Sequence, residues 1–150
     1  MNPTPDALAR LLLFQEILVE LPDEAHIGEF TRRTLRNVPG VSDALICFGG
    51  RMIPPAAGFD AICALCAQAA NAPDSLDLAA CNTLSGAQCF PVWTATQLFG
   101  LLLVRVADES TLQPNRDYLA NVANAVAMVL DTRQYQAQLT ETNHQLRRAR

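Results

Sequence analysis

Five cysteines are the residues of this chain whose types and spacing could do chemistry. Cys63 and Cys66 lie three positions apart on a predicted helix, where residues three apart are neighbours, so both sulfurs could face one point. We predict Cys81 at the end of one strand and Cys89 within the next. Because four thiolates can hold zinc or an iron–sulfur cluster, these four cysteines are candidates for a metal or redox site.

The same cysteines also fit a purely structural role, which we favour. Free cysteine is among the most buried residue types and behaves as a small hydrophobic side chain. The number of cysteines is odd and no secretory signal precedes them, so we expect reduced thiols in a cytoplasmic protein. Burial makes a thiol unreactive, and we therefore expect no disulfide and no bound metal in the protein as purified. A metal-binding or redox role remains the alternative.

Beyond the cysteines, the sequence does not contain the residue patterns that known types of catalysis require. The only histidines are His26 and His144, both on predicted helices. Nucleophilic catalysis needs a base beside the nucleophile, and no Gly-x-Ser-x-Gly, phosphate-binding loop or dinucleotide fingerprint is present. We therefore expect no catalytic residue and no enzyme activity in this chain.

Composition indicates a folded, acidic, soluble module. The 150 residues fit one domain, half of them are hydrophobic, and 17% are charged, which excludes general disorder. The net charge is −4 and every one of the 11 basic residues is arginine, which argues against a nucleic-acid partner. Residues 78–104 carry no charge but include many polar and turn residues, so we interpret them as buried strands rather than a membrane span.

Hydrophobic periodicity and breaker residues predict the order of elements. The first helix is expected to begin at Pro5, with Thr4 as its N-cap. Its apolar residues fall at helical spacing: Leu8, Leu11, Leu12, Leu18 and Val19. After it we predict a helix over 23–38, strands over 41–48 and 51–53, a helix over 61–70, strands over 75–80, 87–94 and 99–106, and one helix from 114 onward.

Three stretches in this order resemble the GAF domain family of sensory modules. They are residues 38–47 (VPGVSDALIC), residues 87–93 followed by 99–104, and residues 112–123. The resemblance covers about residues 8–133. It implies an α+β fold, with an antiparallel sheet, helices packed on one face and a long C-terminal helix. It also implies a ligand pocket on the other face, under the helix near residues 60–70.

The resemblance further implies a non-catalytic sensory domain over residues 1–133. Residues 134–150 are similar to the start of a coiled-coil linker that leads to an output domain in sensor histidine kinases and diguanylate cyclases. The pocket candidates are Cys63, Cys66, Cys81, Cys89 and Trp93, although Trp93 can equally be a core or edge aromatic. Known ligands of the family need a Cys-His pair, an axial histidine or a lysine that this chain lacks, so cofactor and ligand are unknown.

The C-terminal helix carries two apolar stripes. We assign the first to packing against the domain's own sheet: Leu119, Val122, Ala123, Val126 and Leu130. The second alternates steps of three and four residues, as in a coiled-coil seam: Tyr118, Asn121, Ala125, Met128, Thr132, Tyr135, Leu139, Thr142, Leu146 and Ala149. It predicts a parallel homodimer. The alternative to the dimer is a frayed tail, because the polar seam residues weaken the pairing. The alternative to a sensory function is a constitutive dimerisation module that binds no ligand.

Overall fold

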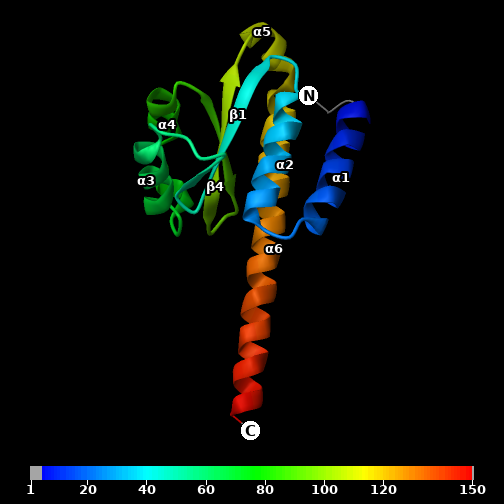
Figure 1. Ribbon diagram of the computed structural model, residues 1–150, viewed down its shortest axis with the longest axis vertical. Helices are drawn as coiled ribbons and strands as arrows, with labels where there is room; N and C mark the ends of the chain where they lie inside the picture. The colour runs from blue at the N-terminus through cyan, green and yellow to red at the C-terminus, as the bar shows by residue number, and fades with distance from the viewer. Residues whose placement is uncertain (1–4, 150) are drawn as a thin grey trace.

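A computed structural model describes residues 5–149, so the expected N-cap Thr4 lies outside the described residues. The fold is α+β, with a four-stranded antiparallel sheet and a long C-terminal helix, as expected (Figure 1). In order, the elements are α1 (Pro5–Glu20), α2 (Glu24–Arg36), β1 (Val41–Phe48), β2 (Arg51–Ile53), α3 (Asp60–Gln68), the 3-10 turn η1 (Pro73–Ser75), α4 (Leu78–Ser85), β3 (Gln88–Trp93), β4 (Leu98–Val106), α5 (Glu109–Leu112), the 3-10 turn η2 (Gln113–Asn115) and α6 (Arg116–Arg148).

The sheet has the strand order β2-β1-β4-β3, with all neighbours antiparallel. Strand β4 lies at its centre and pairs Leu102 with Ile46 of β1 and with Phe90 of β3. Gly100 sits opposite Phe48 of β1, and a Cβ at position 100 would lie 1.9 Å from the carbonyl oxygen of Cys47. Only glycine allows this approach.

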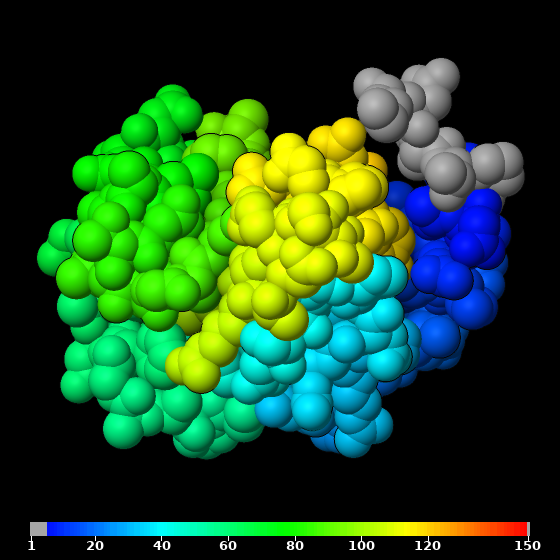
Figure 2. Space-filling view, turned by 90° about the horizontal axis from the view of Figure 1, so that it is seen from above, coloured from blue at the N-terminus to red at the C-terminus, as the bar shows by residue number. Residues whose placement is uncertain are grey.

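Helices cover both faces of the sheet, which corrects the expectation that they pack on one face. On β1, the side chains of Ala44 and Ile46 join the core with α1, α2 and α6, whereas those of Leu45 and Cys47 join a second cluster with α3 and α4. In Figure 2 the segment with α3 and α4 (green) and helix α1 (blue) lie on opposite sides of the molecule. The continuous apolar runs of β1 and β4 are typical of strands buried on both faces.

The expected strand over 75–80 is wrong, because these residues lead into helix α4. The carboxylate of Asp77 accepts a hydrogen bond from the backbone N–H of Ala80 and caps the helix. Gly86 ends it in the left-handed conformation, with φ of 65°. Leu76, Leu78 and Ala80 alternate over too short a stretch to distinguish a strand from the first turn of a capped helix.

Helix α1 buries only two of the five apolar residues that the expected spacing grouped together. Phe14 and Leu18 are buried, and Leu11 is partly buried against the same core. Four large apolar side chains of this helix are exposed instead: Leu8, Leu12, Leu13 and Val19. The helix has apolar residues on more than one side, so periodicity alone did not decide which side faces the core.

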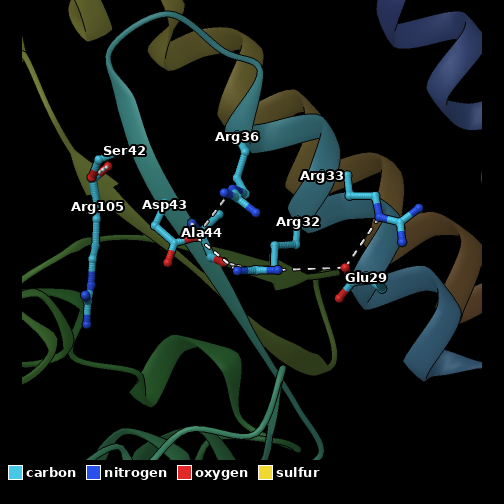
Figure 3. A network of polar contacts seen from close by, with 8 residues as sticks. All are labelled: Glu29, Arg32, Arg33, Arg36, Ser42, Asp43, Ala44 and Arg105. Carbon is cyan, nitrogen blue, oxygen red and sulfur yellow. Dashed lines mark hydrogen bonds and ion pairs between the residues drawn. The ribbon is translucent and has the colours of Figure 1, made fainter.

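A polar network fastens α2 to the sheet (Figure 3). The guanidinium of Arg32 donates to the backbone carbonyl of Ala44, at 3.1 Å, and pairs with the carboxylate of Asp43, at 3.4 Å. Glu29 lies 3.8 Å from the same guanidinium and also pairs with Arg33. Because Arg32 is only 20% exposed, its contacts are stronger than those of a surface ion pair and fix α2 beside β1.

Within residues 5–149, no helix is long and apolar enough to cross a membrane.

Candidate functional site

Cysteines from four elements meet on the second face of the sheet. Cys47 comes from β1, Cys63 and Cys66 from α3, Cys81 from α4 and Cys89 from β3. All belong to the second cluster, which Cys63 joins as a partly buried member. As expected, Cys63 and Cys66 share a helix and Cys89 lies in a strand, but Cys81 is on a helix rather than at a strand end.

Cys47 is the member that sequence reasoning missed. Its side chain is fully buried, and its thiol contacts that of Cys63, with a distance of 3.4 Å between the two Sγ atoms. The signal was available in the alternation of β1, because Leu45 and Cys47 must face the opposite side from Ala44 and Ile46. It was overlooked because all of these residues lie in one continuous apolar run.

The surroundings shift the thiol pKa values in different directions. The pKa of Cys47 is raised far above its ordinary value, first because its hydrogen bond to Cys66 holds the proton and then because it is buried. The same hydrogen bond stabilises the thiolate of Cys66 and lowers its pKa. Burial, followed by the contact with Cys47, raises the pKa of Cys63 to about 12. Cys63 is the only cysteine outside the buried class, so it is the sulfur that a reagent reaches first.

Two further cysteines sit at the edge of the cluster. Burial raises the pKa of Cys81, and it raises the pKa of Cys89 to about 11. The Sγ atom of Cys89 lies 3.6 Å from the hydroxyl of Ser85, and its backbone N–H donates to the side-chain oxygen of Asn82, at 2.8 Å. These contacts join the end of α4 to β3.

Nothing in the described part of the chain arranges three or more His, Cys, Asp or Glu side chains as a metal site. A thiolate site for zinc would need four sulfurs at about 2.3 Å from a common centre. The thiols instead contact one another or their polar neighbours, within a packed apolar layer. The arrangement can support thiol–disulfide chemistry more directly than metal binding.

The remaining pocket candidate and the histidines lie away from the thiols' contacts. Trp93 is partly buried at the end of β3, where it packs against the second cluster. The ring of His26 is exposed and contacts the carboxylate of Asp23, at 2.7 Å, beside the start of α2. His144 is exposed on α6. No histidine in residues 5–149 therefore lies beside a cysteine as a general base.

We expect the protein to lose stability in alkali, because the fold raises the pKa of four of its five thiols. Cys89 has a folded pKa of about 11 against an ordinary value of 9.0, so its contribution is complete below pH 9 and is lost as the pH rises through 11. Between its unfolded and folded pKa values, each such thiol lowers the free energy of unfolding by about 1.4 kcal/mol for each unit by which the pH rises. The chain has no lysine, so few other groups titrate there.

Urea unfolding at a series of pH values between about 8 and 10.5 measures this dependence. Cys89→Ala should flatten the slope in that range. A free energy of unfolding that stays constant across it, or an equal slope in the variant, would contradict the assignment.

Helix α6 is divided into a buried half and an exposed half. The five residues of the first stripe are all buried in the domain core: Leu119, Val122, Ala123, Val126 and Leu130. Leu130 is the last buried residue and Arg133 is partly buried, whereas every residue from Gln134 to Ala149 is exposed. In Figure 1 this second half extends well beyond the sheet and the other helices.

The expected seam must be shortened at its N-terminal end. Ala125 is buried in the domain core, and Tyr118 is partly buried against the same core, where burial raises its pKa. Helix α1 packs along this part of α6, so these two positions are covered by the chain itself. Asn121 is also partly buried, and the seam residues that remain exposed are Met128, Thr132, Tyr135, Leu139, Thr142, Leu146 and Ala149.

Arg133 ties α6 to the end of α1 at the point where α6 leaves the domain. Its guanidinium donates to the backbone carbonyls of Leu18, at 3.3 Å, and Leu21. Carbonyls at the C-terminal end of a helix lack intrahelical donors and carry partial negative charge. An arginine there supplies both hydrogen-bond donors and a positive charge. The two helices are therefore held together next to the exposed half of α6.

Comparisons of the chain with models of protein families, with curated proteins and with solved structures found no significant match.

Proposed function

We propose that this chain is the non-catalytic, GAF-like sensory domain of a cytoplasmic signal-transduction protein, such as a sensor histidine kinase, and that it acts as a parallel homodimer through α6. The division of α6 carries the proposal, because residues 134–148 form helix with no core of their own to cover. Most helix stability in proteins comes from packing. A second copy of the helix, paired along Tyr135, Leu139 and Leu146, supplies that packing.

The exposed apolar side chains support the same interface. Eight of the nine large exposed apolar residues in the described part of the chain lie on α1 and α6. A groove between these helices is lined by Val19, Met128 and Thr132, so the surface of α1 continues into that of α6. Exposed apolar surface concentrated on two neighbouring helices is typical of an interaction site.

The continuity of α6 gives this dimer a means of passing on a signal. Its buried half packs on β3 and α1, and Arg133 fixes its position against α1. A shift of either element would move the exposed half, because both halves belong to one helix. The seam contains Thr132 and Thr142, which weaken a single fixed packing and suit a helix pair that changes register or rotates.

A constitutive dimerisation module is the competing function, and the packed second face favours it. Cys47, Cys81 and Leu101 are fully buried where the ligand pocket was expected. A ligand that binds the folded state raises the melting temperature, so a sensory domain should respond to at least one small molecule. A constitutive module should respond to none.

Cross-linking through Ala149→Cys tests the parallel pairing. In a parallel pair, each seam position faces its own copy, close enough for a disulfide between the two chains. We expect mild oxidation to give a covalent dimer of this variant, and little of it from Ala137→Cys, which lies about 160° around the helix from Leu139. The unsubstituted chain shows the background from native cysteines. Equal cross-linking of both variants, or none of either, would contradict the proposal.

A further inference from the structure

We propose that Cys47 and Cys63 form a reversible intramolecular disulfide by exchange with a low-molecular-weight disulfide. The two Sγ atoms lie 3.4 Å apart, and a disulfide bond is about 2.05 Å long. Closing the remaining gap needs a movement of about 1.4 Å, which a small change of side-chain torsion and helix position can supply. The inference does not depend on dimerisation, because neither cysteine lies on α1 or α6.

The two cysteines differ in access, and this difference assigns their roles. Cys63 of α3 is partly exposed at the margin of the second cluster, whereas Cys47 lies fully buried on β1. A reagent in solution therefore meets Cys63 first. The Sγ atom of Cys47 already lies 3.4 Å from that of Cys63, and the packing of β1 holds it there.

The exchange proceeds in two balanced steps. The Cys63 thiolate attacks one sulfur of a disulfide RSSR, forms a mixed disulfide and releases RS⁻. Cys47 loses its proton to RS⁻ and attacks the Sγ atom of Cys63, which displaces the second RS⁻; the proton lost on ionisation of Cys63 neutralises it. Overall, two protein thiols are oxidised, RSSR is reduced to two RSH, and an excess of RSH reverses both steps.

The high pKa of Cys63 makes the first step slow at neutral pH and strongly dependent on pH. With a pKa of about 12, only a small fraction of Cys63 is thiolate near neutrality. At pH values below this pKa, each increase of one pH unit raises the thiolate fraction, and with it the rate, about tenfold. A pair with this behaviour would follow the thiol–disulfide balance of its surroundings slowly rather than react with brief oxidant pulses.

Helix α3 is suited to the movement. It is a nine-residue helix with no side-chain N-cap, and it is preceded by a loop that contains Gly58 in a left-handed conformation with open space around it. Ile62 and Cys66 anchor its inner side in the second cluster. A disulfide between Cys63 and Cys47 would draw α3 toward β1 and change how this helix packs on the second face of the sheet.

Incubation of the native, reduced chain with oxidised glutathione tests the proposal. After alkylation of the remaining thiols, we expect three modified cysteines instead of five and a protein two hydrogens lighter before alkylation. Cleavage after arginine leaves Cys47 as the one cysteine of residues 37–51, so the internal disulfide links that peptide to residues 52–105. Raising the pH by one unit should speed the reaction about tenfold.

Two matched variants identify the partner of Cys47. Cys63→Ala should abolish the link, whereas Cys66→Ala, one helical turn away, should retain it; circular dichroism checks that both variants are folded. Five free thiols at equilibrium, a stable mixed disulfide on Cys63, a link that survives in Cys63→Ala, or a link between two chains would each overturn the proposal.

Discussion

Replacement of Leu139 and Leu146 with glutamate in one variant is expected to convert a dimeric protein into a monomer. Both side chains are exposed on the half of α6 that lies outside the domain, so the change leaves the fold of the single chain intact. In the proposed dimer it removes four buried leucines and brings four negative charges into the seam. The loss of apolar burial alone, at about 2 kcal/mol for each leucine, weakens association by more than a thousandfold.

A control variant carries the same substitution on the opposite side of the helix. Ala137→Glu/His144→Glu places two glutamates seven residues apart, as in the first variant, at exposed positions that face away from the seam. Light scattering should give the mass of a dimer for this control. Equal masses for the two variants would show that residues 139 and 146 do not join the chains.

Gly100→Ala is expected to have the largest effect on folding. The added Cβ would lie 1.9 Å from the carbonyl oxygen of Cys47 and 2.7 Å from the ring of Phe48, both on the neighbouring strand β1. The first contact is with backbone in the middle of the sheet, so relief requires the two central strands to separate. We expect a loss of about 3 kcal/mol or more in the free energy of unfolding.

Gly28→Ala is the matched control for this substitution. There the added Cβ would meet three side-chain atoms of Ile53, Cδ1 at 2.8 Å, Cγ2 at 3.0 Å and Cβ at 3.2 Å, rather than backbone. Ile53 lies on the edge strand β2, which can shift to relieve these contacts. Alanine also favours the helix by about 1 kcal/mol over glycine, so we expect a net change of less than about 1 kcal/mol. Urea unfolding measures both variants, and a similar stability for the two would contradict the close packing of β1 on β4.

Local signals in the sequence predict an element correctly where its own residues determine whether it forms a helix or a strand. The two N-terminal helices, β1 with its return strand, the β3–β4 hairpin and the long final helix were all predicted from periodicity and from breakers such as Pro39-Gly40. The same reasoning failed at α4, because its cap Asp77 and its end at Gly86 decide the structure more than the short alternation between them.

The sequence does not predict which elements pack against each face of the sheet or against each side of a helix. The sequence does not reveal that α3 and α4 cover the second face of the sheet, and this arrangement brings Cys47 against Cys63. Nor does it reveal that α1 covers Tyr118 and Ala125, since the apolar residues of α1 occupy several sides of the helix. In both cases the outcome depends on tertiary packing between distant segments rather than on local pattern.

The molar mass of the intact chain in solution is the most direct test of the proposed dimer. Light scattering at micromolar concentration should give twice the chain mass of 16.3 kDa. The value should fall toward 16.3 kDa only on strong dilution or in Leu139→Glu/Leu146→Glu. A mass of 16.3 kDa for the unsubstituted chain at micromolar concentration would contradict the parallel dimer and leave residues 134–148 as an unpaired helix.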